Sequence, residues 1–392
     1  MKVIQINCDC GCYSTGKIVS DLSKELIKNG HDSLACYGRD FKETGIPSYK
    51  IGSKIGVLLH AFLSRIFDSC GLHSKHATRK LIKKIADFSP DIIHLHNLHG
   101  YYINYPMLFN FLKKYNKPVV WTLHDCWAFT GHCSYFTFKR CSKWKSLCSR
   151  CPQKKNYPKS ICFDNSRSNY LLKKQLFSSL QNLTLVTPSN WLSGLVSQSF
   201  LKDKKIVCIR NGIDTSLFKK NEGMVQYQYN LQNKKIILGV ASLWDKRKGF
   251  SDMISLSSIL SSEYVLVLIG VSKKQMKHLP PNVLALPKTS NMNELIEWYS
   301  AAYCLVNPTY EDNYPTVNLE AQACGTPVIT YKTGGSSESC VDEQVIECGN
   351  VCGLKSAIEN LELQINKNLI CDTKVMLKNY LSVYEECNKT RT

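Results

Sequence analysis

The sequence predicts an α/β protein of two doubly wound domains, each built on a parallel sheet. Three observations lead to this prediction. Short apolar runs alternate with helix-like segments along nearly all of the 392 residues. That length is enough for two domains of ordinary size. The composition, 44% hydrophobic and 21% charged, is that of a folded protein and excludes the disordered, collagen-like and fibrous classes.

The apolar runs give the expected strands in chain order. In the first half they cover residues 3–7, 33–37, 92–96, 119–123 and 183–187, and an amphipathic helix over 16–28 is ended by Asn29-Gly30. In the second half they cover residues 235–241, 265–269, 283–286, 303–306 and 327–330. Strands separated by helices pair in parallel through crossover connections, so each half is expected to form one sheet.

The boundary between the two domains is expected near residues 213–221. We assign residues 1–215 to an N-terminal domain with a Cys-rich insertion at about 126–160. Residues 216–392 form a C-terminal domain whose last helix packs back on the first. The charge balance changes in the same region: residues 1–200 carry 28 Lys+Arg and 11 Asp+Glu, a net +17, whereas residues 201–392 carry 22 and 20, a net +2. A basic half indicates nucleic acid, an anionic membrane surface or a phosphorylated small molecule as partner.

The chain is expected to be cytoplasmic, either soluble or peripheral. The first strand begins almost at Met1, with no signal peptide before it. The apolar stretch at 55–67 contains His60 and Arg65 and is too short to span a bilayer. Most of the 19 cysteines stand singly in apolar surroundings, which does not fit a secreted disulfide scaffold.

Ligands of doubly wound sheets bind beyond the carboxyl ends of the strands, so the loops that follow strands are the places to search. After the first strand comes the turn Cys10-Gly11-Cys12-Tyr13-Ser14-Thr15-Gly16-Lys17, which opens a helix and is either an anion site or a tight turn without a ligand. After the strand 235–241 comes Lys246-Arg247-Lys248-Gly249, either a diphosphate clamp or a solvated basic turn.

The most informative segment runs from Pro308 to Ile329. Here a strand ends in an acidic loop containing Asp312, and the following helix carries Glu320 eight residues later. With one carboxylate in the loop and the other two turns into the helix, both can contact one ligand. Carboxylates accept hydrogen bonds from hydroxyl groups, so the pair indicates a sugar and a ribose.

This segment resembles the signature of retaining glycosyltransferases of family 4. The resemblance implies the GT-B fold, in which two Rossmann-like domains face each other across a cleft. It extends to Thr187-Pro188-Ser189, Asn211-Gly212-Ile213-Asp214, Thr333-Gly334-Gly335 and the loops at 94–100 and 122–125. Trp244, Arg247-Lys248-Gly249 and the Cys-rich insertion are similar to the colanic-acid-type subgroup of bacterial surface-polysaccharide enzymes. The sequence departs from the family at Asp312, where the family has Glu, and at Ser242, where many members have Arg.

The resemblance implies a role for each matching residue. Arg247 and Lys248 would neutralise the diphosphate of a UDP- or GDP-linked sugar donor and stabilise the leaving group. Asp312 would hold the donor sugar, and His124 would hydrogen-bond it from across the cleft. The remaining donor-binding residues are Gly11, Gly16, Asn313, Tyr314, Thr316 and Glu320, the last of which would bind the ribose. The resemblance also implies retention of configuration without a catalytic metal or an established covalent nucleophile.

The acceptor implied by the resemblance is a lipid-linked oligosaccharide of a bacterial surface polysaccharide. Residues 55–67 with Lys54 and Arg65, followed by further basic residues, indicate either contact with an anionic membrane surface or a core helix with a solvated basic face. We therefore expect a peripheral location on the inner face of the cytoplasmic membrane.

The Cys-rich insertion leaves its chemistry open. Cys133, Cys141, Cys148 and Cys151 would hold a structural Zn²⁺, or they are free or redox-active thiols. The insertion is basic, with Tyr135, Phe136, Phe138 and Trp144 interleaved, so the alternatives are a non-catalytic nucleic-acid-binding protein with a zinc knuckle and a sugar-nucleotide epimerase of the same fold. We favour the transferase and expect no nucleic-acid partner, because nucleic-acid binding leaves the Asp312–Glu320 segment unexplained. A glycosidase pair is rejected, because the Arg-Lys clamp has no role in hydrolysing a neutral glycoside.

Overall fold

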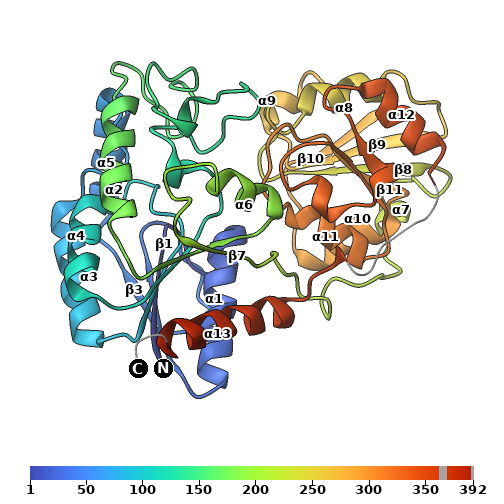
Figure 1. Ribbon diagram of the computed structural model, residues 1–392. Helices are drawn as coiled ribbons and strands as arrows, with labels where there is room; N and C mark the ends of the chain where they lie inside the picture. Colours follow the sequence, from blue (N-terminus) through green and yellow to red (C-terminus); the bar gives the residue numbers. More distant parts are fainter. Residues whose placement is uncertain (362–368, 390–392) are drawn as a thin grey trace. The chain divides into compact units, whose positions relative to one another are not determined.

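The computed structural model describes residues 1–361 and 369–389. The chain divides into two compact units: Met1–Ile209 together with the chain from Leu377 onward, and Arg210–Met376. Each unit contains one all-parallel sheet whose strands are joined mostly through helices (Figure 1). The predicted fold class, α/β with two doubly wound domains, is therefore confirmed.

The first unit contains a seven-stranded sheet in the order β3-β2-β1-β4-β5-β6-β7. Its strands are β1 (Lys2–Asn7), β2 (Asp32–Tyr37), β3 (Ser48–Lys50), β4 (Ile92–Leu95), β5 (Val119–Thr122), β6 (Leu183–Thr187) and β7 (Lys205–Cys208). Its helices are α1 (Tyr13–Lys28), α2 (Lys54–Phe67), α3 (Lys75–Phe88), α4 (Tyr105–Tyr115), α5 (Ser166–Ser178) and α6 (Asn190–Val196), with the short 3₁₀ turns η1 (Trp127–Phe129) and η2 (Lys143–Lys145). The reversal of strand order at β1 places ligand-binding loops at the carboxyl ends of β1 and β4.

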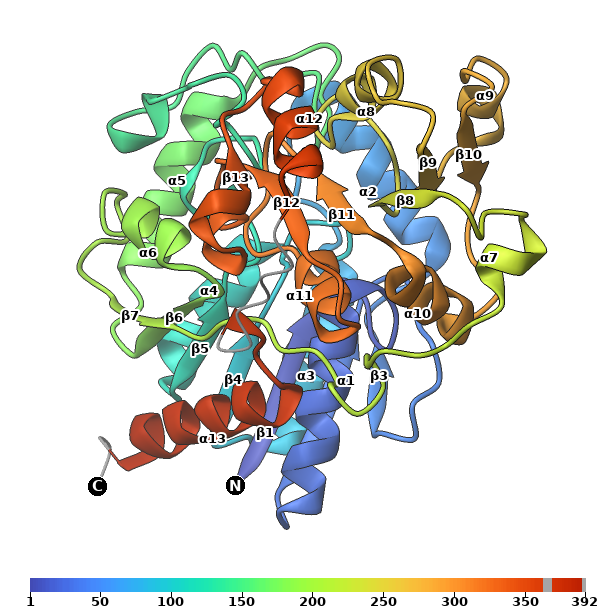
Figure 2. The same ribbon diagram turned by 90° about the vertical axis from the view of Figure 1, so that its right-hand side faces the viewer.

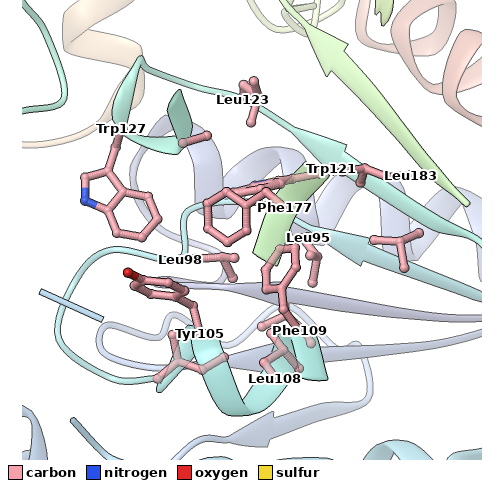
Figure 3. Packing of buried hydrophobic residues seen from close by; sticks show 14 of the residues in the cluster. Leu95, Leu98, Tyr105, Leu108, Phe109, Trp121, Leu123, Trp127, Phe177 and Leu183 are labelled. Carbon is pink, nitrogen blue, oxygen red and sulfur yellow. The ribbon is translucent and has the colours of Figure 1, made fainter. Parts of the chain in front are cut away.

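Aromatic side chains fill the space between this sheet and its helices. The Phe177 ring of α5 lies 4.4 Å from Phe109 of α4 and 4.9 Å from Trp121 of β5, measured between centroids. Figure 3 shows these three rings grouped within the cluster. All three are at most 2% exposed, so the apolar runs that predicted the strands do form a core.

The C-terminal helix α13 (Thr373–Lys389) belongs to the first unit from Leu377 onward (Figures 1 and 2). It contacts three neighbouring strands of the sheet. Tyr384 Oη is 2.6 Å from His94 Nδ1 on β4, Tyr380 Oη is 3.1 Å from Thr122 Oγ1 on β5, and Cys387 Sγ is 3.4 Å from Thr184 Oγ1 on β6. A segment distant in sequence thus completes the packing of this sheet.

The second unit contains a six-stranded sheet in the order β10-β9-β8-β11-β12-β13. Its strands are β8 (Lys235–Val240), β9 (Tyr264–Ile269), β10 (Val283–Leu286), β11 (Cys304–Asn307), β12 (Val328–Tyr331) and β13 (Val345–Ile346). Its helices are α7 (Val225–Gln228), α8 (Phe250–Ser257), α9 (Lys273–Met276), α10 (Met292–Ala301), α11 (Thr316–Ala323) and α12 (Val351–Glu359), with the 3₁₀ turns η3 (Ser337–Ser339) and η4 (Asp342–Gln344). Here the strand order reverses at β8, so the loops after β8 and β11 are the expected ligand loops.

The ten predicted strands are present within one or two residues of their expected ends. Three further strands, β3, β7 and β13, were not predicted. Each lies at the edge of its sheet, is two to four residues long and has no fully buried residue. An edge strand with so little burial has no apolar run to mark it. Among the described residues, no helix combines the length and the hydropathy needed to cross a membrane.

Candidate active site

The predicted donor site brings together two loops at the carboxyl edge of the six-stranded sheet. Lys248 lies between β8 and α8, and Asp312 lies between β11 and α11. The Lys248 Nζ is 2.5 Å from Asp312 Oδ2, in an ion pair whose side chains are 20% and 15% exposed. The cation and the carboxylate predicted for the donor are therefore in direct contact, and each satisfies the other.

Two glycines permit this close approach of the loops. Gly249 has φ +71°, and a Cβ there would lie 2.1 Å from the carbonyl oxygen of Pro308. Gly334 has φ +54°, and a Cβ there would lie 1.9 Å from the carbonyl oxygen of Asp312. A larger residue at either position would force backbone segments apart. The Lys-Gly and Gly-Gly pairs seen in the sequence thus shape the loop that carries Asp312.

Arg247 holds the same acidic loop through its backbone. The Arg247 Nη1 donates to the carbonyl oxygen of Glu311 at 2.8 Å, and the Arg247 carbonyl accepts from the Tyr310 N–H at 2.7 Å. Arg247 therefore fixes the position of the loop, whereas its neighbour Lys248 reaches the Asp312 carboxylate.

Helix α11 presents the second carboxylate. Glu320 Oε2 accepts a hydrogen bond from the Tyr299 hydroxyl of α10 at 2.9 Å, which orients the carboxylate. The N-terminal turn of α11 begins at Thr316, where the helix dipole favours negative charge. Asn313 and Tyr314 before it are buried, and the Tyr314 carbonyl accepts from Asn211 Nδ2 at 3.1 Å. The backbone predicted to hold the donor is thus anchored to the segment that contains Asn211.

Asn318 anchors α11, although sequence reasoning did not single it out. Its side chain is fully buried, accepts from Asn307 Nδ2 at 2.8 Å and donates to Ser339 Oγ at 2.9 Å. These bonds connect α11 with β11 and with η3. The signal that could have identified it is an amide one helical turn from Ala321 and Gln322, on the inward face of the helix.

Asp252 is a second anchor that sequence reasoning missed. Its Oδ2 accepts from the hydroxyls of Tyr310 and Tyr331, each at 2.7 Å. Asp252 lies on α8, Tyr310 in the acidic loop and Tyr331 at the end of β12, so one buried carboxylate joins three elements behind the site. No local pattern in the sequence marks such a contact.

In the first unit, the predicted Gly11 and Gly16 shape the turn between β1 and α1. Gly11 has φ +70°, and a Cβ there would lie 2.3 Å from the carbonyl oxygen of Lys42. A Cβ at Gly16 would lie 3.2 Å from the backbone of Asp9 and Cys10. Both glycines therefore permit close packing of the protein's own backbone at this turn.

His124 follows β5 and belongs to a row of three stacked histidines. Its Nε2 is 3.2 Å from His96 Nδ1, and the ring centroids of His94 and His96 lie 3.9 Å apart. Burial lowers the pKa of His124 to about 4, although the negative charge of Asp125 acts to raise it. Burial also lowers the pKa values of His94 and His96. His124 is therefore neutral at pH 7 and suited to hydrogen bonding with a hydroxyl group.

Asp125 begins a chain of contacts toward the surface. Its Oδ2 lies 2.8 Å from His99 Nε2, and His99 Nδ1 lies 2.9 Å from the Tyr157 hydroxyl. Burial alone would raise the pKa of Asp125, but the His99 ring and the Trp127 N–H hold it below its usual value. Sequence reasoning placed His99 in a loop that resembles family 4 but missed Tyr157, which comes from the Cys-rich insertion.

Four of the five cysteines of the insertion, Cys133, Cys141, Cys148 and Cys151, line one small cavity together with His132. The thiols of Cys133 and Cys151 are hydrogen-bonded, which raises the pKa of Cys133 and lowers that of Cys151. However, no group of three or more His, Cys, Asp or Glu side chains within residues 1–361 and 369–389 is placed to hold a metal ion. The zinc interpretation of Cys133, Cys141, Cys148 and Cys151 therefore finds no ligand set in this part of the chain.

The insertion has an apolar core. Phe129, Phe136 and Trp144 are at most 4% exposed and pack with the main cluster of the first unit. The buried Lys173 Nζ donates to the carbonyl oxygens of Trp127 and Thr130 at 2.7 and 3.1 Å. Two of the four aromatics that suggested base stacking are therefore buried, which removes much of the support for nucleic-acid binding.

Comparison with known proteins gives two family matches that together span most of the chain. The model described as Glycosyltransferase Family 4 matches residues 15–217, and the model described as Glycosyl transferases group 1 matches residues 226–379.

Two similar proteins are named for surface polysaccharides. The chain is 24% identical over 371 residues to the putative colanic acid biosynthesis glycosyl transferase WcaC of Escherichia coli, covering 88% of this chain and 89% of that protein. It is 24% identical over 199 residues to the capsular polysaccharide biosynthesis glycosyltransferase CapM of Staphylococcus aureus, covering 46% and 51%.

Solved structures of similar fold cover nearly the whole chain. Sucrose-phosphate synthase from Thermosynechococcus elongatus has a TM-score of 0.69 at 15% identity, covering 98% of this chain and 99% of that one. Anabaena HepE in complex with UDP has a TM-score of 0.68 at 14% identity, covering 98% and 100%. At these identities the likeness shows the fold alone.

Proposed function

The chain belongs to glycosyltransferase family 4, and from this membership we propose that it transfers a sugar from a nucleotide-diphosphate donor to a lipid-linked oligosaccharide. It is a glycosyltransferase of GT-B fold from a family that retains the anomeric configuration. The observation that carries the proposal is the Lys248–Asp312 ion pair at the carboxyl edge of the six-stranded sheet. At this edge a cation suited to binding the diphosphate is in contact with a carboxylate suited to binding the sugar.

Donor binding would exchange this ion pair for two contacts with the ligand. The Lys248 ammonium would turn to the diphosphate, and the Asp312 carboxylate would accept hydrogen bonds from sugar hydroxyls. The N-terminal turn of α11, with the backbone from Asn313 to Thr316, would add N–H groups, and Glu320 would accept from the ribose.

Transfer then depends on stabilising the leaving nucleotide diphosphate. As the bond from the anomeric carbon to the phosphate oxygen breaks, negative charge grows on that oxygen. Lys248 opposes this charge, and Arg247 keeps the acidic loop in place through Glu311. Neutral His124 would hydrogen-bond the sugar, and the turn shaped by Gly11 and Gly16 belongs to the proposed site in the first unit. No metal takes part in this proposal.

The proposed acceptor and pathway are inferred from the names of similar proteins. Two similar proteins are named for colanic acid and capsular polysaccharide, so we assign the chain to bacterial surface polysaccharide synthesis. A neighbouring structure of HepE is in complex with UDP-glucose, which supports a UDP-linked donor, with GDP as the other candidate.

A membrane-surface location is supported by α2. Ile55, Leu58, Leu59 and Phe62 on this helix are 57–78% exposed, although they are large and apolar. With Lys54 and Arg65 on the same helix, this face suits contact with anionic lipid on the inner side of the cytoplasmic membrane.

The test compares Lys248→Ala with Lys246→Ala, which removes an exposed cation from the same turn. Nucleotide release and product formation are measured with a panel of UDP- and GDP-sugars and extracted lipid-linked acceptors. We expect Lys248→Ala to lower kcat/KM by roughly 10²- to 10³-fold, because it removes charge stabilisation of the leaving group. Lys246→Ala is expected to stay within about twofold of the unaltered protein.

Equal losses in both variants would contradict the assignment of Lys248. Interconversion of donor sugars without an acceptor would instead identify an epimerase. Thermal unfolding of both variants checks that the fold is intact.

A further inference from the structure

A cavity of about 620 Å³ opens at the carboxyl edge of the seven-stranded sheet, outside the donor site. Its walls are the loop after β2, the end of β3, one side of α2 and the loop at residues 155–159. Six basic side chains line it: Arg39, Lys50, Lys54, Arg65, Lys155 and Lys159. The acidic residue among its lining is Asp40.

Most of this positive charge has no counter-charge in the described part of the chain. Arg39 lies 3.7 Å from Asp40, but no carboxylate oxygen of residues 1–361 or 369–389 lies within 4.0 Å of the other five cations. Like charges gathered around one cavity repel each other and attract an anion. The cavity therefore suits a ligand that carries more than one negative charge.

The two basic walls are joined to each other. The Arg65 carbonyl of α2 accepts from the Ile161 N–H at 2.6 Å, and the Ile66 carbonyl accepts from the Phe163 N–H at 3.0 Å. The Arg65 guanidinium also lies 6.0 Å from the Tyr101 ring centroid. The loop that supplies Lys155 and Lys159 is thus fixed beside the end of α2, which makes the cavity a formed site.

The cavity is connected to the proposed catalytic histidine of the same unit. Tyr157 lines it, and its hydroxyl meets His99, which pairs with Asp125 beside His124. An anion bound here would lie at the same edge of the sheet as His124.

The rim of the cavity is apolar. Leu58 of α2 lines the cavity and is 69% exposed, next to the exposed Ile55 and Phe62. On the neighbouring loop, Ile161 and Phe163 are 58% and 54% exposed. A ligand with an anionic head and an apolar tail fits this arrangement better than a wholly polar one.

We propose that this cavity binds the diphosphate of a lipid-diphosphate-linked acceptor, with the lipid chain lying against α2. The inference rests on the proposed function and names the part of the acceptor that the first unit recognises. A diphosphate diester carries about two negative charges, which several basic side chains can share, whereas an ordinary phospholipid head offers a single phosphate.

The test measures binding to phosphatidylcholine vesicles that contain polyprenyl diphosphate, at 0.15 M salt and without a sugar donor. Matched vesicles contain phosphatidylglycerol at equal total charge. We expect at least tenfold tighter binding to the diphosphate vesicles. The double variant Lys155→Gln/Lys159→Gln should lose this preference, and so should Lys54→Gln/Arg65→Gln. The control Arg79→Gln/Lys83→Gln removes two exposed charges from α3 and should keep it.

Equal binding to both kinds of vesicle would reduce the cavity to a general anionic contact and overturn the proposal. Retention of the preference in both cavity variants would do the same, as would displacement of the vesicles by a single-stranded oligonucleotide. Because no donor is present, this result is independent of nucleotide release, so failure here and failure of the transferase proposal are distinguishable.

Discussion

At the scale of single residues, burial lowers the pKa values of the three histidines in the row, His94, His96 and His124. His94 and His96 are at most 1% exposed, and their ring nitrogens meet Tyr384, Thr122 and Gln5. These contacts pack His94 and His96 against their neighbours at the end of β4. His124, at the end of the row, is the member proposed to contact the sugar.

This burial predicts a loss of stability in mild acid. Histidine in an unfolded chain titrates near about 6.5, whereas the pKa of His124 is about 4 and those of His94 and His96 are also lowered. Below about pH 6.5 the unfolded chain binds more protons, so the stability that is complete above this pH falls as the pH decreases. The urea midpoint should therefore drop between pH 7.5 and pH 5.5, and His96→Gln should weaken that pH dependence.

The control is His278→Gln, which changes an exposed histidine of the second unit. It should leave the pH dependence of the urea midpoint unchanged. The same slope in both variants would show that the buried row is not responsible.

At the scale of elements, the site depends on how α11 is attached to the sheet behind it. Asn318 joins α11 to β11 and η3, and Gln322 Nε2 donates to the Ser339 carbonyl at 2.7 Å. Glu320 lies between Asn318 and Gln322 on the same helix, so its position depends on this attachment. A loose α11 would misplace both Glu320 and the N-terminal turn.

Asn318→Ala should lower the free energy of unfolding by about 1–3 kcal/mol, because it leaves Asn307 and Ser339 buried without their partner. Urea unfolding of the variant measures this change. Asn233→Ala, at an exposed position before β8, serves as the matched control and should change stability by no more than about 0.5 kcal/mol. Equal effects at the two positions would mean that the buried network contributes nothing specific.

The elements that the sequence predicted are those with a long apolar run. β1, β5 and β8 are buried along nearly their whole length, so their apolar pattern is continuous. β3 (Ser48–Lys50) has no fully buried residue, so its sequence contains no apolar run that would predict a strand. Lys248 and Asp312 were each assigned to the donor from the family resemblance, but their direct ion pair was not predicted. Tyr157, by contrast, comes from a loop without periodicity, and only tertiary packing brings it to His99.

At the scale of the whole molecule, the two units carry different charge and different tasks. The donor residues Lys248, Asp312 and Glu320 belong to the second unit, in the half of the sequence with a net charge of only +2. The basic excess of +17 belongs to the first 200 residues, and the cavity between α2 and the 155–159 loop collects six of those cations. Family 4 membership accounts for the donor residues, and the proposed acceptor diphosphate accounts for this part of the charge.

Retaining transfer from a nucleotide-diphosphate sugar is tested most directly by the product of a single reaction. Purified protein is incubated with the UDP- or GDP-sugar that gives nucleotide release and with lipid-linked acceptor, and the new linkage is examined by NMR. We predict one sugar added per nucleotide released, with the anomeric configuration of the donor. An inverted linkage, or donor consumption without any added sugar, would contradict it.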